Sequence, residues 1–353
     1  MDEKMTNRTD MILGYSRMKD RSLFDKDEID FIEKNIDNLH RIGTTEYYSG
    51  IAGKDKNDPL RMQFIPDKRE IDIAGYETSD PLCEKQFSPR GGIIHRYHDR
   101  ILFLASGRCP LYCRHCFRRY LGERGFKDAD ESDVDSLIRY ITEHRQIREV
   151  LISGGDPLML EDDFLEYICR RIRAAGKGVV IRIGTRVPVV YPSRVDDSLA
   201  GMLSKYRPLY IFTQFNHSRE ITDQSSKAVE LFVKSGIPVF NQSVLLRGIN
   251  NSEAELESLF YSLVSISVKP YYLFQGDLAS GTSHLRTPLD EGLRLMQSLR
   301  EKMSLLSLPL FAVDLPGGGG KAALEMSSIV KKENGFYQIK SSNGRAAQYP
   351  VEG

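Results

Sequence analysis

Short runs of β-branched and aromatic residues recur along the chain from about residue 100. The runs occupy residues 101–106, 149–153, 179–183, 209–215, 238–246, 269–274 and 310–315. Runs of this length and composition are typical of strands. We therefore predict a strand over each of them.

Segments with helical apolar spacing lie between several of these runs. They cover residues 133–144, 162–176, 226–236 and 252–264. The central strands come about every 30 residues, which is the period of βαβ units and implies a parallel sheet with right-handed crossovers. Six strands and a late seventh are too few for a closed eight-stranded barrel. We therefore predict an α/β fold, a partial (βα)6-type TIM barrel, with a doubly wound open sheet as the competing architecture.

The regions on either side of the predicted barrel, which we expect over residues 96–316, have weaker patterns. Residues 1–95 should form a helical and irregular N-terminal region, because 27–42 has helical apolar spacing and a later stretch carries several Asp, Pro and Gly residues. Residues 317–353 should form a short C-terminal extension. The pair Asn343-Gly344, between alternating polar and apolar residues, predicts a hairpin there.

The composition is that of a globular protein with a sizeable core. Of the 353 residues, 41% are hydrophobic and 28% are charged. Lys plus Arg and Asp plus Glu both number 49, and this balance argues against nucleic acid or an anionic membrane as the main partner. No apolar run reaches the roughly 20 residues needed to span a bilayer. Because the charged start also lacks a secretory signal, we expect a cytoplasmic protein.

Three of the five cysteines lie within eight residues, in the segment SGRCPLYCRHCFRRY. Cys109, Cys113 and Cys116 follow directly after the first predicted barrel strand. In a reducing compartment such crowding favours a metal over a disulfide. Three thiolates on one loop can bind three irons of a 4Fe-4S cluster and leave the fourth iron open to a small molecule. A zinc site would need a fourth arm, for which His115 is a poor candidate because it lies between the ligands.

Polar residues follow nearly every predicted strand. Catalytic groups of parallel barrels gather at the C-terminal ends of the strands, so these residues are candidates for a site. Gly154, Gly155 and Asp156 follow the second strand, where the glycines expose backbone to a ligand, although an ordinary strand-to-helix turn would use the same residues. Other candidates on this rim are Gln214, Asn216, His217, Asn241, Gln242, Gln275, Gly276, Asp277 and Asp314.

A glycine-rich segment, PGGGGK, begins the C-terminal extension and ends in Lys321. It is not a phosphate-binding P-loop, because Ala322 stands where that motif requires Ser or Thr. Four consecutive glycines let a loop approach a cofactor closely, and a lysine there can anchor pyridoxal phosphate covalently. A flexible linker is the alternative.

Several of these motifs, in the same order, resemble one known family. They are HRYHDRILFL, CRHCFRR, LISGGDPL, NQSVLLRG, KPYYLFQGDL and VDLPGGGGK, between about residues 90 and 321, with Tyr112 as the aromatic before the second cysteine. The chain resembles the radical S-adenosylmethionine superfamily and, within it, the lysine 2,3-aminomutase family. The resemblance implies a cluster whose open iron binds S-adenosylmethionine and whose electron releases a 5′-deoxyadenosyl radical.

The resemblance also implies roles for individual residues. It implies pyridoxal phosphate at Lys321, Arg96, Tyr97 and Arg100, further cofactor contacts at His115, Gly154, Gly155, Asp156 and Gln242, and substrate contacts at Arg118, Asp277 and Asp314. A guanidinium suits a substrate carboxylate because its fork binds both oxygens. Two carboxylates suit a distal ammonium. The alternatives are solvated surface charge for Arg118 and Arg119, and a helix cap for Asp277.

The sequence departs from the family pattern at two places. Long lysine aminomutases carry zinc-binding cysteines, whereas this chain has Ser252 at the partner position and no cysteine after Cys169. We therefore expect no structural zinc, and the swapped tetramer of the family is in doubt, although a homo-oligomer is expected. Phe274 stands where relatives often have a hydroxyl or imidazole group, which would alter cofactor contacts or substrate preference.

Three functions follow from these observations. The favoured one, implied by the resemblance, is an isomerase that interconverts L-lysine and L-β-lysine, with an electron donor such as flavodoxin or ferredoxin. The second is the same chemistry on another amino acid, such as ornithine, arginine or glutamate, or on lysine for elongation factor P modification. The third is a non-catalytic iron–sulfur protein, which would need neither Lys321 nor the aspartate pair.

Overall fold

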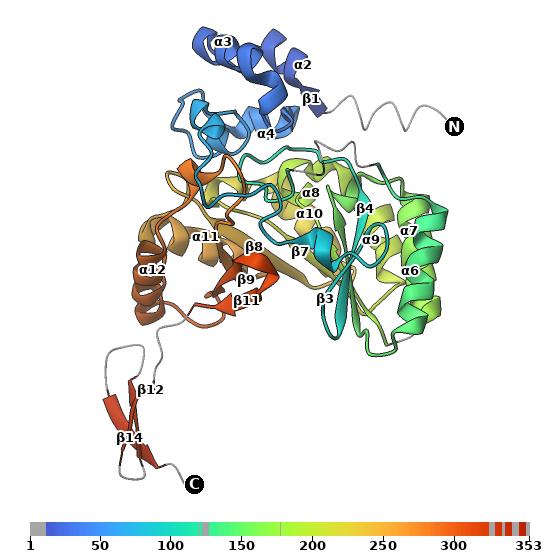
Figure 1. Ribbon diagram of the computed structural model, residues 1–353, viewed down its shortest axis with the longest axis vertical. Coiled ribbons are helices and arrows are strands. Elements are labelled where there is room, and N and C mark those ends of the chain that lie inside the picture. Colours follow the sequence, from blue (N-terminus) through green and yellow to red (C-terminus); the bar gives the residue numbers. More distant parts are fainter. Residues whose placement is uncertain are drawn as a thin grey trace.

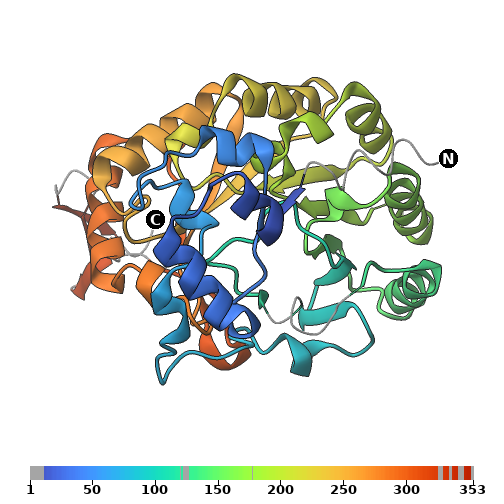
Figure 2. The ribbon, with the colours of Figure 1, turned by 90° about the horizontal axis from the view of Figure 1, so that it is seen from above.

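The computed structural model describes residues 12–119, 121, 127–176, 178–324, 329–333, 336–340 and 346–350. Its centre is a nine-stranded sheet with the strand order β11-β10-β9-β8-β7-β6-β5-β4-β3. The sheet curves into an incomplete ring with helices on its outside (Figures 1 and 2). This is the partial barrel that the sequence predicts.

The strands from β4 to β10 pair in parallel and in chain order. They are β4 (Arg100–Ser106), β5 (Glu149–Gly154), β6 (Val180–Gly184), β7 (Leu209–Thr213), β8 (Val239–Leu245), β9 (Val268–Gln275) and β10 (Leu310–Leu315). Each coincides with a predicted run, so these predictions are confirmed. A doubly wound sheet would reverse its strand order at a switch point. The unbroken order therefore excludes that alternative.

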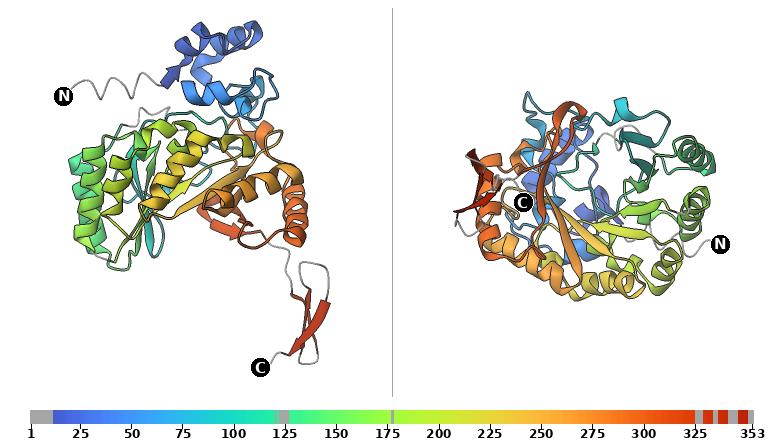
Figure 3. Two further views of the ribbon diagram at one scale, coloured as in Figure 1. Left: turned by 180° about the vertical axis from the view of Figure 1, so that it is seen from behind. Right: turned by 90° about the horizontal axis from the view of Figure 1, so that it is seen from below.

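An antiparallel strand completes each edge of the sheet. β3 (Ile93–Tyr97) pairs with β4, and β11 (Gly320–Ala323) pairs with β10. The sequence did not predict either strand, and the expected start of the barrel at residue 96 falls inside β3. A side chain joins the two edges, because the backbone N–H of Lys321 donates to Tyr97 Oη at 3.0 Å. The ring is thus nearly closed, as the view from below shows (Figure 3).

The outer layer consists of helices between the strands, most of them amphipathic (Figure 2). They are α6 (Glu131–Glu143), α7 (Asp162–Ala175), α8 (Val187–Val190), α9 (Asp197–Ser204), α10 (Asp223–Lys234), α11 (Glu253–Ser265) and α12 (Leu289–Lys302). α7 is representative, since its buried residues Leu165, Ile168, Cys169 and Ile172 recur at helical spacing. Burial of such faces against the sheet forms the main core.

The N-terminal region covers one end of the barrel (Figure 1). It contains β1 (Ile12–Gly14), α2 (Tyr15–Asp20), α3 (Lys26–Asn35), β2 (Gly43–Thr45), α4 (Glu46–Ile51) and short 3-10 helices, η2 (Arg61–Gln63), η3 (Lys68–Ile71) and η4 (Glu84–Phe87) among them. Its backbone receives hydrogen bonds from the cysteine loop, where Tyr112 N donates to Gly43 O at 3.0 Å and Arg114 N donates to Gln63 O at 2.9 Å. That loop follows β4, so the N-terminal region lies over the C-terminal ends of the strands.

A separate antiparallel sheet lies near the C-terminus. It consists of β12 (Ile329–Glu333), β13 (Phe336–Lys340) and β14 (Ala346–Pro350). The pairing of β13 with β14 confirms the antiparallel arrangement expected of the hairpin. The expected turn, Asn343-Gly344, lies outside the described residues. Within the described part of the chain, no helix combines the length and apolar character that crossing a membrane requires.

Candidate active site

A cavity of about 370 Å³ occupies the inside of the barrel. Its wall includes every cofactor and substrate residue that the family resemblance implies, although these residues lie far apart in the chain. They are Arg96, Tyr97, Arg100, Cys109, Cys113, His115, Cys116, Arg118, Gly154, Gly155, Asp156, Gln242, Asp277, Asp314 and Lys321. The cysteines, Arg118, Gly154, Gly155, Asp156 and Asp277 lie at or after the C-terminal ends of parallel strands, which share one rim. Arg96 and Tyr97 lie on the antiparallel β3, Lys321 lies on the antiparallel β11, and Arg100 begins β4.

The other rim candidates divide into one that lines the cavity and five that do not. Gln214 is part of the wall, whereas Asn216, His217, Asn241, Gln275 and Gly276 are not. Asn241 instead binds the backbone of Phe215, from which its Oδ1 accepts a hydrogen bond at 2.7 Å. A polar residue near a strand end can thus bind the neighbouring backbone instead of a ligand. The sequence alone does not distinguish these two roles.

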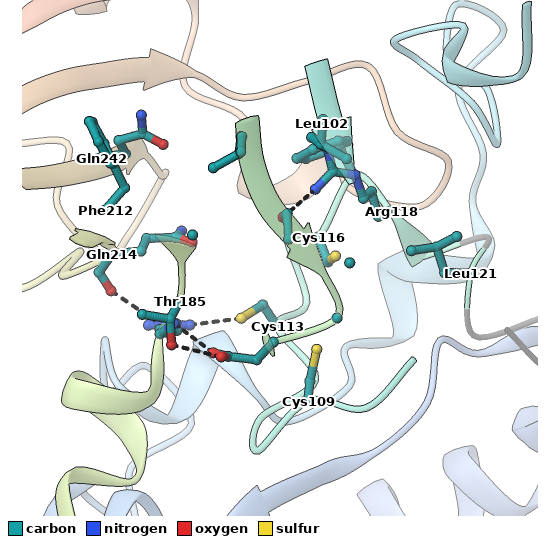
Figure 4. Close-up of a pocket in the computed structure, with 18 of the residues that line it drawn as sticks. Leu102, Cys109, Cys113, Cys116, Arg118, Leu121, Thr185, Phe212, Gln214 and Gln242 are labelled. Atoms are coloured by element: carbon teal, nitrogen blue, oxygen red, sulfur yellow. Dashed lines mark hydrogen bonds between the residues drawn. The ribbon is translucent and has the colours of Figure 1, made fainter. Parts of the chain in front are cut away.

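The three cysteines lie on the loop after β4 and line this cavity (Figure 4). Burial raises the pKa of the Cys109 thiol well above its ordinary value and raises that of Cys116 to about 11. Among the described residues, no three His, Cys, Asp or Glu side chains are grouped closely enough to hold a single metal ion. Thiols spread along a cavity wall fit an iron–sulfur cluster, in which each thiolate binds a different iron.

A buried carboxylate from the N-terminal region fixes the cysteine loop. Glu70 lies 2.5 Å from Arg114 Nη2 and 2.5 Å from Arg119 Nη2, and its side chain is 1% exposed. Burial alone would raise the pKa of Glu70, but the two guanidiniums hold it below its ordinary value. Arg119 is therefore not a solvated surface charge, and that alternative is wrong.

Arg118 also has a buried partner that the sequence did not reveal. Its Nη2 lies 2.7 Å from Glu84 Oε1, its Nε lies 2.9 Å from Glu84 Oε2, and its Nη1 donates to Ser153 Oγ at 3.1 Å. The surface-charge alternative is wrong for Arg118 as well. A substrate carboxylate at this guanidinium would share it with Glu84.

The Gly154-Gly155-Asp156 turn packs directly against the cysteine loop. Gly154 has φ +126°, and a Cβ there would lie 2.4 Å from Ser106 O. The carboxylate of Asp156 accepts hydrogen bonds from Thr185 Oγ1 and from Arg186 N, both at 2.7 Å, and burial raises its pKa. The turn thus ties the ends of β4, β5 and β6 together, and both carboxylate oxygens of Asp156 bind groups of the protein.

The glycine-rich segment is an ordered turn between β10 and β11, and the linker alternative is wrong. Gly317, Gly318 and Gly320 have φ values of +68°, +78° and +80°, which side chains rarely adopt. A Cβ on Gly318 would also lie 2.4 Å from Phe87 Cε2. The turn holds Lys321 over the cavity.

Lys321 lies among acidic and aromatic side chains at this end of the cavity. Its Nζ is 2.6 Å from Asp314 Oδ2 and 4.6 Å from the centre of the Phe274 ring. Arg96 Nη1 is 3.8 Å from Asp314 Oδ1. Burial and then the nearby Asp314 raise the pKa of Asp277 to about 7. Asp277 caps none of the described helices, so its carboxylate belongs to the cavity.

Several buried polar atoms on the cavity wall lack a hydrogen-bond partner. They include Arg96 Nε, His115 Nδ1 and Asp314 Oδ1. Burial of such atoms without a partner is costly. His115 is held by Gln214, with the Nε2 atoms of the two side chains 2.9 Å apart, and burial lowers its pKa well below the ordinary value. The wall is therefore suited to polar ligands that would complete these contacts.

Arg186, directly after β6, is a site residue that the sequence analysis missed. Its Nη1 donates to Cys113 Sγ at 2.8 Å, which is the dashed line that ends on Cys113 in Figure 4. The available signal was its position, because it follows the third predicted strand just as the other candidates follow theirs. The residues after that strand were not included among the rim candidates.

Comparison with known proteins agrees with this geometry. Residues 104–259 match the model of the radical SAM superfamily. The chain is 40% identical to the L-lysine 2,3-aminomutase of Acetoanaerobium sticklandii over 323 residues, which cover 92% of this chain and 78% of that protein. This chain belongs to the lysine 2,3-aminomutase family of radical SAM enzymes. As a family member it is an aminomutase, an isomerase, and the alternative of a non-catalytic iron–sulfur protein is set aside.

Other members of the lysine 2,3-aminomutase family match this chain at similar levels. The L-lysine 2,3-aminomutase of Clostridium subterminale is 39% identical over 92% of this chain and 78% of that protein. The glutamate 2,3-aminomutase of Clostridioides difficile is 38% identical over 93% of this chain and 77% of that protein. Identity alone therefore does not separate the two substrates.

Proposed function

We propose that this aminomutase interconverts L-lysine and L-β-lysine by moving the amino group between C2 and C3. The observation that carries the proposal is the pair of acids, Asp277 and Asp314, on the wall that also holds Lys321. Asp314 already binds an ammonium, that of Lys321, at 2.6 Å. A distal carboxylate, as in glutamate, would meet two acids there, whereas the distal ammonium of lysine would be stabilised by them.

The residues on the cavity wall divide between two cofactor regions. The 4Fe-4S cluster would be held by Cys109, Cys113 and Cys116, and S-adenosylmethionine would be bordered by Gly154, Gly155, Asp156, His115 and Gln242. Pyridoxal phosphate would be held by Lys321, Arg96, Tyr97 and Arg100. When bound, these groups supply a radical that removes hydrogen and a carrier for the migrating amino group. An electron carrier such as flavodoxin or ferredoxin would supply the electron.

The chain's own side chains then bind and orient the substrate. Arg118 would hold its α-carboxylate beside Glu84, and the acid pair would hold its distal ammonium. These two contacts fix both ends of the amino acid and so the position of C3 between them. The N-terminal region over the strand ends would exclude water from the reactive species.

The proposal is tested by product identification. Purified protein with a reconstituted cluster is incubated under reducing conditions with S-adenosylmethionine and pyridoxal phosphate, and separately with L-lysine, L-ornithine, L-arginine and L-glutamate. We expect β-lysine as the main product. A β-amino acid from glutamate alone, or no 2,3-shift with any basic amino acid, would contradict the proposal, and preference for another basic amino acid would support the second candidate.

A further inference from the structure

One of the three cysteines receives a hydrogen bond from a buried guanidinium. Arg186 Nη1 donates to Cys113 Sγ at 2.8 Å. The Arg186 residue is 7% exposed, so water does not screen its charge from the sulfur. A buried positive charge therefore lies directly against this thiol.

The rest of the guanidinium is fixed by buried partners. Arg186 Nη2 lies 2.7 Å from Glu220 Oε1 and 2.5 Å from Gln63 Oε1, and Nε donates to Gln214 O at 3.2 Å. The backbone N–H of Arg186 is bound by Asp156. These contacts leave the side chain little freedom to turn away, so Nη1 stays directed at Cys113.

Glu220 does not bind Arg186 alone. Its carboxylate also accepts hydrogen bonds from Tyr48 Oη and from the backbone N–H groups of Asn216 and His217. A carboxylate whose charge is shared among several donors attracts each of them less strongly. Nη1 itself donates to Cys113 Sγ, whereas the contact with Glu220 is made by Nη2.

We propose that Arg186 is a positioning residue for Cys113 that raises the reduction potential of the cluster carried by the three cysteines. One-electron reduction adds a negative charge to a cluster, and a nearby cation with an N–H donor stabilises the reduced form more than the oxidised form. Hydrogen bonds to the sulfurs and net charge are established controls of iron–sulfur potentials. The inference requires the cluster of the proposed function but not the identity of its amino acid substrate.

The test is a potentiometric titration of the reconstituted cluster without S-adenosylmethionine, followed by electron paramagnetic resonance of the reduced state. We expect the midpoint of Arg186→Gln to shift to a more negative potential than that of the wild type. Arg186→Lys keeps the positive charge but loses the guanidinium N–H that donates to Cys113, so we expect a smaller shift in the same direction. The control is Arg194→Gln, another buried arginine, which binds Leu158 O and Asp162 away from the cavity wall and should leave the midpoint unchanged.

A wild-type midpoint in Arg186→Gln with full iron content would overturn the inference. If Arg186→Gln takes up too little iron to be measured, the titration of Arg186→Lys decides: a negative shift supports the inference and a wild-type midpoint overturns it. This result would not affect the proposed function, because the formation of β-lysine does not depend on whether the midpoint potential of Arg186→Gln is shifted. Absence of β-lysine, conversely, leaves the potentials of the variants measurable.

Discussion

Lys321 and Asp314 lie directly opposite each other on the antiparallel strands β11 and β10, with Nζ and Oδ2 2.6 Å apart. The turn between them contains Pro316 and four glycines, of which Gly317, Gly318 and Gly320 have left-handed conformations that give the hairpin its tight reversal. The strand register therefore sets the ion pair. Any insertion in the turn that shifts the register would separate Lys321 from the acid that faces it.

Replacement of Lys321 by alanine should abolish covalent binding of pyridoxal phosphate while the protein stays folded. The lysine side chain is 33% exposed, so its removal leaves no large cavity in a core. Borohydride reduction followed by mass spectrometry measures the bound cofactor. The matched control is Lys234→Ala on α10, where the lysine pairs with Glu230 at the surface. Borohydride-stable cofactor in Lys321→Ala at the wild-type level would refute the assignment.

The affinity for lysine should rise as the pH increases through about 7. Burial and Asp314 raise the pKa of Asp277 to about 7, so the carboxyl is neutral below this pH and charged above it. Only the charged form attracts an ammonium strongly, and bound lysine should in turn lower the pKa of Asp277. The measurement is KM for lysine between about pH 6 and 8, either side of that pKa, which should fall with pH in the wild type. Asp277→Asn should raise KM and flatten this dependence, and an equally steep fall in the variant would exclude Asp277 as its source.

Replacement of Glu70 by alanine should destabilise the protein strongly. It would leave the buried guanidiniums of Arg114 and Arg119 without their carboxylate, and loss of one partner of a buried pair costs about 3–5 kcal/mol. Denaturant unfolding measures the loss, and iron uptake by the cysteine loop should fall with it. Glu230→Ala, which breaks an exposed pair, should cost at most about 1 kcal/mol. Equal losses in the two variants would contradict the role given to Glu70.

Replacement of Gly154 by alanine should displace the cysteine loop. The new Cβ would lie 2.4 Å from Ser106 O at a φ of +126°, and both strain and the contact with backbone oppose it. We expect a loss of about 1–3 kcal/mol in the free energy of unfolding and reduced cluster content. Gly201→Ala is the control, because no atom lies within 4 Å of its added Cβ and the residue is inside α9. That change should be neutral or stabilising by up to about 1 kcal/mol.

The strands of the barrel were predictable because the signal for each is local. Apolar runs such as 149–153 and 238–246 are bounded by turn residues, and the helices between them carry their own spacing. The two edge strands, β3 and β11, lack such a signal. In β3 only Ile93 and Ile94 precede the polar His95 and Arg96, and β11 has four residues of which the first two are Gly320 and Lys321, so neither strand contains an apolar run of the predicted kind.

The N-terminal contacts of the site depend on distant parts of the chain, which explains why the sequence did not reveal them. Glu70 and Glu84 lie in a segment rich in loops, and nothing in their immediate neighbourhood marks them as partners of Arg114 and Arg118. Arg186 was missed for a different reason. Its position after a strand was visible, but its contact with Cys113 depends on the fold that brings residues 73 positions apart together.

We expect one cavity to hold both the source of the radical and the amino acid bound at Lys321. The most direct measurement is isotope transfer from lysine deuterated at C3 to 5′-deoxyadenosine, followed by mass spectrometry. We expect deuterium in 5′-deoxyadenosine only when both pyridoxal phosphate and lysine are present, and loss of that label in Lys321→Ala. A shared cavity would be contradicted if the complete mixture formed only unlabelled 5′-deoxyadenosine, at the same rate as the mixture without lysine.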